Sequence, residues 1–378
     1  MNVGIYIHIP FCKSRCIYCG FYSTTNKELK ERYVDALIRE IHMRKDDFAR
    51  LGTSLSPSST STVYFGGGTP SSLSVCDIER IVGALESTFN GTPSEVTLEM
   101  NPDDVTEDYI KAVRQMGINR ISMGIQPFDD SRLQFIRRRH NASQAEKAVM
   151  TIREEEIHNV SIDLMFGFPN QTMDEWVTDI DKAIALHPTH ISAYSLMYEE
   201  DTPLFRMLQK GEINQIDDET SLAMYTELIN RLTANGYEHY EISNFAMPGY
   251  RSVHNSSYWH DTPYLGFGAA AHSYNKDTRS WNIPDLKKYI ESIESGVLPS
   301  ESEVIDADTH YNDLITTALR TREGLNLDDL PQKYREYALV NAKKSISEHL
   351  LEATDSHIRL TREGLFVSDM VMSELIKA

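Results

Sequence analysis

Short apolar runs alternate with longer amphipathic stretches through the first half of the chain. Six of the short runs contain many β-branched or aromatic residues and predict strands, at residues 4–9, 62–65, 95–99, 120–124, 160–166 and 191–196. After the first of them, Tyr33, Leu37 and Ile41 recur at helical spacing and predict an amphipathic helix. Alternating strands and helices are typical of a parallel sheet. We therefore expect an α/β fold whose six units form an open, partial (β/α)6 barrel of the TIM type.

This alternation ends near residue 210. Helices are predicted at residues 217–234 and 285–295, on either side of an aromatic-rich region with few regular repeats. Further helices follow residue 306, and then two short apolar runs at residues 357–360 and 364–367 predict strands around a turn. Such an order is typical of a small α+β, winged-helix-like domain. We expect three parts: a barrel at 1–210, a barrel extension at 211–304 and a C-terminal domain at 305–378.

One pentapeptide occurs twice in the C-terminal part of the chain. The sequence Thr-Arg-Glu-Gly-Leu begins at Thr321 and again at Thr361. Repeat architectures show periods of some 20 to 50 similar residues, and five residues do not meet that description. We interpret the repetition of this pentapeptide as coincidence.

Composition narrows the choice of partners and compartment. Of 378 residues, 40% are hydrophobic, which is enough for a globular protein, and the formal net charge of −19 opposes binding to nucleic acid or to anionic membrane surfaces. No run of about 18 apolar residues predicts a membrane span. The N-terminus shows no signal peptide, and only 4 cysteines are present. We expect a location in the reducing cytoplasm.

Three of the four cysteines lie in one short loop. Cys12, Cys16 and Cys19 follow the pattern Cys-x3-Cys-x2-Cys directly after the first predicted strand. Soft thiolate ligands are those that iron–sulfur clusters select. Because a fourth local cysteine is missing, a four-iron cluster held here would leave one iron open to another ligand. The pattern therefore indicates an iron–sulfur centre with an accessible iron.

Other interpretations of the loop are weaker. Three clustered cysteines cannot all pair in disulfides, and Cys76 lies far along the chain in a helical stretch at 73–89, where we expect a small buried side chain. A structural zinc site would need a fourth ligand, and His8 is the nearby candidate. Its apolar neighbours predict instead a histidine packed within a strand.

Polar residues recur where the predicted strands end. Glu99, Gln126 and Asp163 lie at or near the ends of three successive strands, Met197 follows the sixth, and the glycine-rich turn 66–69 follows the second. In parallel αβ barrels these strand ends form the active site. Three consecutive glycines allow close approach of a ligand, although such a turn is also common before a helix. We expect one polar ligand to lie across the barrel mouth.

With these motifs in place, the chain resembles the radical S-adenosylmethionine (SAM) superfamily, and within it the oxygen-independent coproporphyrinogen dehydrogenase group. The resemblance implies a [4Fe-4S] cluster on the three cysteines, with SAM bound to the open iron through its methionine group. It covers nearly the whole chain and is carried, in order, by segments that begin at Tyr6, Phe65, Glu99, Ser122, Arg138, Asp163 and Tyr240. By this resemblance the SAM contacts are Tyr6, Tyr18, Gly66, Gly67, Gly68, Thr69, Glu99, Gln126, Arg138, Asp163 and, through its backbone, Met197.

The group has two branches, and this chain departs from the dehydrogenases. Those enzymes carry a fourth cysteine two residues after the third, where this chain has Phe21, and they have a longer segment before the cluster loop. The other branch comprises heme chaperones with a His-Asn-x-x-Tyr-Trp signature, matched here by His254, Asn255, Tyr258 and Trp259. Membership of that branch implies heme binding, a homodimer in the cluster-loaded state, and delivery of heme to respiratory proteins.

The signature has a physical interpretation of its own. A histidine with an amide, a phenol and an indole offers an iron ligand, hydrogen-bond donors and flat aromatic surface for a porphyrin. The same residues also suit a buried aromatic corner in which His254 is structural, and His260 and His272 are rival ligands. The small residues at 266–271 suggest close backbone approach at the barrel rim.

These observations favour a heme chaperone that binds heme, a [4Fe-4S] cluster and SAM. An alternative is an oxygen-independent coproporphyrinogen III dehydrogenase, in which reductive cleavage of SAM gives a radical that starts oxidative decarboxylation of propionate groups. A third possibility, radical chemistry on an unrelated substrate, is compatible with the cysteine pattern alone. Phe21 favours the heme chaperone over the dehydrogenase.

Overall fold

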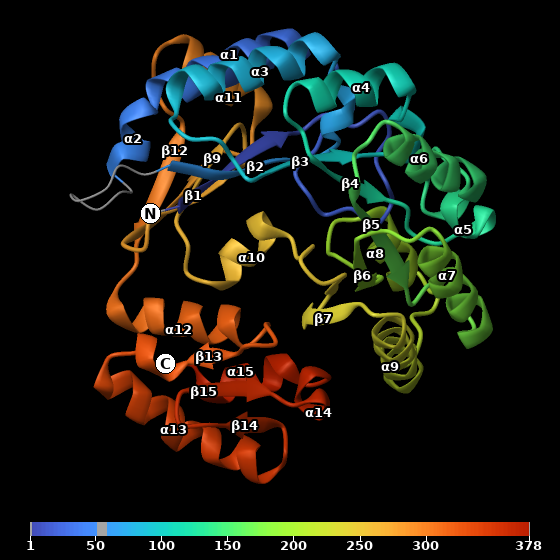
Figure 1. The fold of residues 1–378 in the computed structure, drawn as a ribbon, viewed down its shortest axis with the longest axis vertical. Helices are drawn as coiled ribbons and strands as arrows, with labels where there is room; N and C mark the ends of the chain where they lie inside the picture. Colours follow the sequence, from blue (N-terminus) through green and yellow to red (C-terminus); the bar gives the residue numbers. More distant parts are fainter. Residues whose placement is uncertain (1, 51–58, 378) are drawn as a thin grey trace.

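A computed structural model describes residues 2–50 and 59–377, and its centre is a twisted sheet (Figure 1). Six parallel strands lie side by side in chain order: β1 (Asn2–Ile9), β2 (Ser59–Gly67), β3 (Glu95–Met100), β4 (Arg120–Gly124), β5 (Asn159–Phe166) and β6 (His190–Ser195). Most of their residues are buried, and polar side chains such as Thr62, Thr97 and Ser161 alternate with apolar ones along the strands. All six predicted strands are confirmed.

Short strands extend the sheet at both edges. On one side β9 (Tyr264–Phe267) pairs in parallel with β1, and the antiparallel strands β10 (His272–Tyr274), β11 (Thr278–Asn282) and β12 (Ser300–Val304) follow. On the other side β6 pairs with β8 (Asn244–Ala246) and β8 with β7 (Glu238–Glu241). Among the described residues no pairing joins β12 to β7, so the barrel is open, as predicted.

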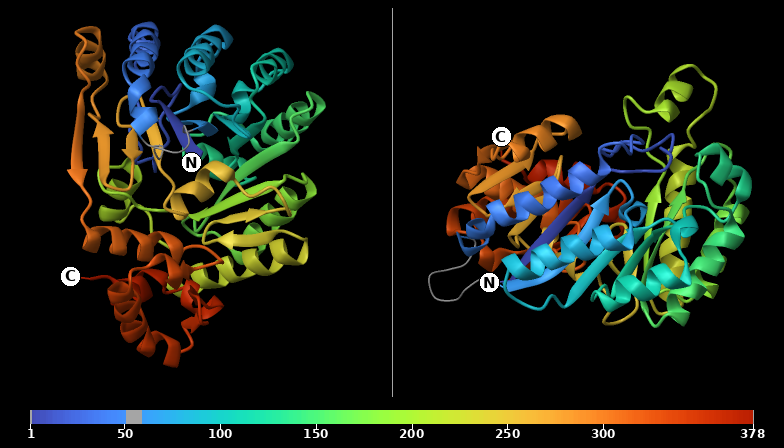
Figure 2. Two further views of the ribbon diagram at one scale, coloured as in Figure 1. Left: turned by 60° about the vertical axis from the view of Figure 1, so that its left-hand side comes forward. Right: turned by 90° about the horizontal axis from the view of Figure 1, so that it is seen from above.

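Helices cover the outer face of this sheet (Figure 2). Capping side chains explain several of their boundaries: Ser74, Asn141 and Thr172 each form a capping box, and Asp217 and Asp285 cap the two helices predicted in the second half. The helices of this part of the chain, including α10, which lies inside the barrel, are α1 (Lys30–Met43), α2 (Lys45–Arg50), α3 (Val75–Thr88), α4 (Glu107–Gln115), α5 (Asp130–Phe135), α6 (Ala142–Glu154), α7 (Met173–Ala185), α8 (Pro203–Gln209), α9 (Asp218–Ala234), α10 (Val253–Trp259) and α11 (Leu286–Glu294), with 3-10 turns at Pro70–Ser72 and Pro102–Asp104.

The C-terminal part has its own apolar core, which extends from Tyr311 to Leu375. It contains α12 (Ala307–Ala318), β13 (Leu325–Asn326), a 3-10 turn (Leu327–Asp329), α13 (Gln332–Ser347), β14 (Leu351–Ala353), β15 (His357–Leu360), α14 (Arg362–Leu365) and α15 (Ser368–Leu375). The sheet order is β13-β15-β14. This arrangement fits the expected winged-helix-like α+β domain. The three-part division of the chain stays a prediction.

Two predictions about single segments are wrong. Residues 364–367 do not form a strand, because Thr361 caps α14 by accepting a hydrogen bond from the Gly364 amide at 3.0 Å, and the partners of β15 are β14 and β13. Cys76 is exposed rather than buried, because it lies on the outer side of α3.

Among the helices that the structure describes, none combines the length and the apolar character that crossing a bilayer requires. The longest of them, α9, has 17 residues and carries charged side chains along its length. A transmembrane helix needs about 20 mostly apolar residues.

A buried ion pair connects the first helix to the sheet extension. Glu40 on α1 is fully buried and pairs with Arg44 at 3.1 Å. Its carboxylate also accepts hydrogen bonds from the Gly268 amide at 2.8 Å, the Asn282 amide group at 2.8 Å and the Tyr289 hydroxyl at 2.6 Å. One side chain therefore holds α1, β11, α11 and the end of β9 together.

We predict that Glu40→Ala lowers the free energy of unfolding by about 3–5 kcal/mol, because Arg44 loses its buried counterion and the three donors lose their acceptor. Thermal and urea unfolding measure the loss. Arg32→Ala is the matched control, since Arg32 pairs with Glu294 between α1 and α11 at the exposed surface. Its melting temperature should stay near that of the wild type. Equal effects of the two substitutions would contradict the role of burial.

Candidate functional site

The cysteine loop leaves the carboxyl end of β1 and is fixed at both ends by backbone hydrogen bonds. The Cys12 amide donates to the Thr24 carbonyl at 2.9 Å, and the Thr24 amide donates to the Pro10 carbonyl at 2.7 Å. Within the loop, Ile17 is buried in a small apolar cluster with Met165 and Leu204. The loop thus has an anchored apolar residue between Cys16 and Cys19, both of which line the pocket.

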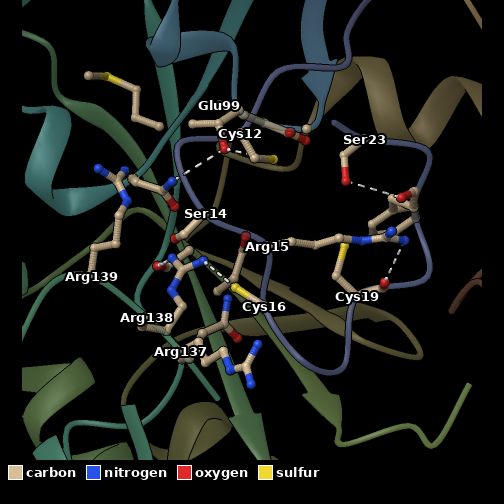
Figure 3. A pocket seen from close by; sticks show the side chains of 18 of the residues that line it. Cys12, Ser14, Arg15, Cys16, Cys19, Ser23, Glu99, Arg137, Arg138 and Arg139 are labelled. Carbon is tan, nitrogen blue, oxygen red and sulfur yellow. Dashed lines mark hydrogen bonds between the residues drawn. The ribbon is translucent and has the colours of Figure 1, made fainter. Parts of the chain in front are cut away.

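All three thiols line one pocket at the mouth of the barrel (Figure 3). Thr69 Oγ1 donates a hydrogen bond to Cys12 Sγ at 3.5 Å, and Arg138 Nη1 donates to Cys16 Sγ at 3.8 Å. Burial raises the pKa of the Cys12 and Cys19 thiols, so cationic iron is needed to hold them as thiolates near neutral pH. The hydrogen bonds to sulfur are of the kind that tunes iron–sulfur clusters.

The arrangement suits a cluster better than a single zinc ion. In the described part of the chain, no three His, Cys, Asp or Glu side chains converge as the ligands of one metal ion do. A four-iron cluster needs no such convergence, because each thiolate binds a different iron. His8 is also occupied: its Nε2 bonds to the Tyr22 carbonyl and its Nδ1 to the Tyr6 hydroxyl, both at 3.1 Å. The prediction that His8 is a packed strand residue is confirmed.

Most of the sequence-predicted cofactor residues meet in this pocket, and three do not. Those that line it, besides the cysteines, are Tyr18, Gly67, Gly68, Thr69, Glu99, Gln126, Arg138 and Asp163. Gly66 lies outside it, Tyr6 stacks on Tyr64, and Met197 has 63% of its surface exposed. The roles assigned to all of these residues remain predictions.

The glycine turn after β2 is required by its packing against the end of β1. Gly67 has a φ of +111°, and a Cβ on it would lie 2.7 Å from the His8 ring. A Cβ on Gly68 would lie 2.8 Å from the Pro10 carbonyl carbon. A larger residue at either position would force the turn away from the cysteine loop. The glycines therefore hold Thr69 beside Cys12.

Two half-buried carboxyl groups, those of Glu99 and Asp163, face the pocket from β3 and β5. Burial raises the pKa of Glu99 to about 7, although a hydrogen bond from the Tyr64 hydroxyl at 2.7 Å opposes the shift. Burial also raises the pKa of Asp163, against the effect of the Arg120 charge. Both groups are suited to accept hydrogen bonds from ligand hydroxyl or amino groups when ionised.

The structure adds polar residues that sequence reasoning missed. Lys13 pairs with Asp104, and Arg139 pairs with Asp103, so that the turn after β3 is tied to the cysteine loop and to the segment before α6. Further polar lining residues that were not assigned to the cofactor are Ser14, Arg15, Ser23, Asn101, Ser122, Arg137 and His140. The family-like segment that begins at Arg138 includes Arg139 and His140 and was the available signal, but only Arg138 was assigned to the cofactor.

The residues fit a polar cofactor on a cluster. Asp103 Oδ1, Arg138 Nε and His140 Nδ1 are buried and have no hydrogen-bond partner within the described residues. Buried polar atoms without partners are costly, and a ligand with amino, carboxylate and hydroxyl groups would satisfy them. In such a complex the three cysteines would hold a [4Fe-4S] cluster, and Glu99, Gln126, Arg138 and Asp163 would contact SAM.

The His-Asn-x-x-Tyr-Trp residues lie elsewhere, on α10, inside the barrel and near the starts of β1 and β2 (Figure 1). His254 is fully buried, with Nδ1 2.8 Å from Thr62 Oγ1 and Nε2 2.8 Å from the Tyr258 hydroxyl. Burial lowers its pKa to about 3, so the ring is neutral. Both ring nitrogens are occupied, and iron ligation by His254 would require breaking one of these bonds.

A line of side chains joins the motif to the cofactor pocket. The His254 ring stacks on Tyr64 with ring centres 5.0 Å apart, and the Tyr64 hydroxyl donates to Glu99. At the other end, Glu95 holds α10 by accepting hydrogen bonds from the Val253 and His254 amides, both at 2.9 Å. The barrel interior is therefore a continuous stack of polar and aromatic groups.

Comparisons with known proteins agree with this architecture. The family described as "Radical SAM superfamily" matches residues 6–183, and "HemN C-terminal domain" matches residues 305–367. The heme chaperone HemW of Bacillus subtilis (strain 168) is 32% identical over 380 residues, which is 98% of each chain. HemW of Mycobacterium tuberculosis (strain ATCC 25618 / H37Rv) is 31% identical over 379 residues, covering 99% of this chain and 94% of that one.

A solved structure shares the fold. The coproporphyrinogen III oxidase HemN of Escherichia coli superposes with a TM-score of 0.84 at 23% identity, covering 99% of this chain and 90% of that one. An open barrel with a three-cysteine loop after its first strand is the architecture of radical SAM proteins. Within that superfamily, the chain belongs to the HemW family.

We predict that Cys16→Ser abolishes a stable [4Fe-4S] centre after anaerobic reconstitution, because one iron loses its protein ligand. Iron and sulfide analysis with a visible absorption spectrum measures cluster content. Cys76→Ser is the matched control, since Cys76 is exposed and does not line the pocket. Full cluster content in Cys16→Ser would show that the loop is not the cluster site.

Proposed function

We propose that the protein is a cytoplasmic heme chaperone that carries a [4Fe-4S] cluster and SAM, forms a homodimer when cluster-loaded and passes heme to respiratory proteins. The observation that carries the proposal is similarity over 98% of the chain to a protein named heme chaperone. The cofactor pocket supports the cluster and SAM part, because three thiols and four polar side chains of the expected kinds meet there. Bound SAM would supply a reactive methionine sulfonium group next to the open iron.

Coproporphyrinogen dehydrogenation remains the competing function, and the loop argues against it. Phe21 takes the place of the fourth cysteine that the dehydrogenases carry, and 74% of its surface is exposed beside Cys19. An exposed phenyl ring can neither ligate iron nor transfer electrons as a thiolate does. The chain therefore has the cluster ligands of a SAM-binding site without the additional cysteine of the enzymes.

The heme-binding surface that we propose is an aromatic cleft beside α10. Tyr258, Trp259, Tyr264 and Tyr274 line a cavity of about 360 Å³ with Leu314 of α12. Flat aromatic rings suit contact with a porphyrin face. Trp259 Nε1 is buried and, within the described residues, has no hydrogen-bond acceptor, so a ligand carboxylate would satisfy it.

We further propose that His260, rather than His254, ligates the heme iron. His260 is exposed at the end of α10 and lies in the sequence between Trp259 and Asp261, which line the cleft. Its Nδ1 lies 2.6 Å from the Ser256 carbonyl, to which it donates, and this leaves the Nε2 lone pair free. Metal-binding histidines typically show this arrangement. His254 would then position α10 through Thr62 and Tyr258.

The test of the proposed function compares two activities of one anaerobically reconstituted sample. We predict saturable binding of heme, with affinity that depends weakly on salt because a chain of net charge −19 does not attract anionic propionates at long range. We also predict no conversion of coproporphyrinogen III in the presence of SAM and reductant. Absorption titration and product chromatography measure the two. Multiple turnovers of porphyrinogen without heme binding would establish the enzyme instead.

A second prediction separates the candidate ligands. His260→Ala should shift the Soret band and weaken heme binding by about tenfold or more, while its melting temperature stays unchanged. His254→Ala should lower the melting temperature, because Thr62 and Tyr258 lose a buried partner, and should keep the Soret position. The reverse pattern would make His254 the ligand. If neither variant shifts the band, the ligand role passes to exposed His272.

A further inference from the structure

A third hollow lies where the edge of the large sheet meets the C-terminal part, away from the cysteine loop and from the aromatic cleft. Its volume is about 330 Å³, within the range of small-ligand sites. Four arginines line it: Arg320, Arg322, Arg359 and Arg362. Glu241 and Glu352 line the hollow as well, so four guanidinium groups face two carboxyl groups in a chain that has 56 acidic and 37 basic residues.

The repeated pentapeptide supplies two of these arginines. Thr321 accepts a hydrogen bond from the Gly324 amide at 3.1 Å, and Thr361 accepts one from the Gly364 amide at 3.0 Å, although the first copy is a bend before β13 and the second begins α14. Both copies line the hollow. Arg322 and Arg362 hold the same position in the two copies, and the charge of each lowers the pKa of the buried His239 ring, although burial lowers it most.

The threonine and the glycine of each pentapeptide have structural roles that do not depend on the arginine side chain. A Cβ on Gly324 would lie 2.3 Å from the Ile358 carbonyl oxygen, and one on Gly364 would lie 1.9 Å from the Leu350 carbonyl oxygen. Each glycine is therefore required by close backbone packing, and each threonine closes its turn. Neither function needs a guanidinium group at the second position.

Backbone pairing fixes one turn against the large sheet. The Ile242 amide donates to the Arg320 carbonyl at 3.1 Å, and the Arg322 amide donates to the Tyr240 carbonyl at 3.0 Å. These bonds form an antiparallel bridge between Glu241 and Thr321. The hollow is thus preformed at a hydrogen-bonded junction rather than in a free loop.

Charge pairing leaves the two repeated arginines without acidic partners. Arg320 lies 3.5 Å from Asp369, and Arg359 pairs with Glu352. Arg362 donates only to the neutral Asn230 side chain at 2.6 Å, and the Arg322 guanidinium has no hydrogen bond or ion pair among the described residues. Burial raises the pKa of Glu241, at the wall of the hollow, to about 7, which lessens its repulsion of an anion.

We propose that this hollow binds a small dianionic oxyanion, held between Arg322 and Arg362. Guanidinium groups bind phosphate and carboxylate oxygens through paired, charge-assisted hydrogen bonds. The two chemical sources that fit are a phosphate compound and a dicarboxylate. The hollow is separate from the aromatic cleft proposed for heme and from the cysteine pocket, because it shares no lining residue with either.

The experiment titrates the full-length protein, without heme, with pyrophosphate and separately with succinate by isothermal titration calorimetry at low and high salt. We expect one saturable site for at least one of the two anions, and the anion that binds identifies the source. Arg322→Gln and Arg362→Gln should each weaken binding by about tenfold or more, and the double variant should abolish it. Salt should weaken binding as well.

Lys343→Gln is the matched control, because it removes one positive charge from an exposed position of α13 that lies outside the hollow. It should bind as the wild type does. Circular dichroism and thermal melting establish that the arginine variants are folded, and Arg322→Lys, which keeps the charge, should bind with intermediate affinity. Absence of saturable binding for both anions, or wild-type affinity in a folded double variant, would overturn the proposal.

Discussion

The open sheet depends on how β1 is held inside it. The buried Glu40 carboxylate is the group that stabilises this position. β1 lies in the middle of the sheet only because β9 pairs with it on the side away from β2. The carboxylate binds the backbone just after β9 and side chains from β11 and α11. A charge buried this deeply is tolerated because Arg44 and three neutral donors satisfy it. Because the cysteine loop follows β1, its position depends on this contact.

The interior of the barrel is polar as well as apolar, and this links two sites at opposite ends of the strands. Glu99 faces the cofactor pocket, Tyr64 lies below it, and His254 lies below Tyr64 on a helix held by Glu95. Arg120 is almost fully buried in the same region, 4.0 Å from Glu95. Because these groups are in contact, a change in the charge of Glu99 would alter the electrostatic environment of the stacked groups as far as α10.

Sequence patterns predicted what depends on regular periodicity. The six core strands, the helices α1, α3, α9 and α11, and the clustering of the three cysteines followed from apolar alternation, helical spacing and cysteine spacing. The strands β7 to β12 were missed because they are only 3 to 5 residues long, and β10 to β12 are in addition largely outside the core, so their apolar pattern is faint. The place of His254 inside the barrel depends on tertiary contacts from Thr62 and Glu95, far away in the chain, which no local pattern contains.

The fixed ends of the cysteine loop have a consequence for how such proteins diverge. Because backbone groups of Pro10, Cys12 and Thr24 close the loop and Ile17 anchors its middle, an exposed side chain of the loop contributes little to holding the barrel in shape. An exposed position such as Phe21 can therefore exchange phenyl for thiol at small cost in folding. Gain or loss of a redox-active side chain beside the cluster is then an evolutionary step separate from the scaffold. One fold could supply both a catalyst and a carrier of porphyrins by changes within this loop.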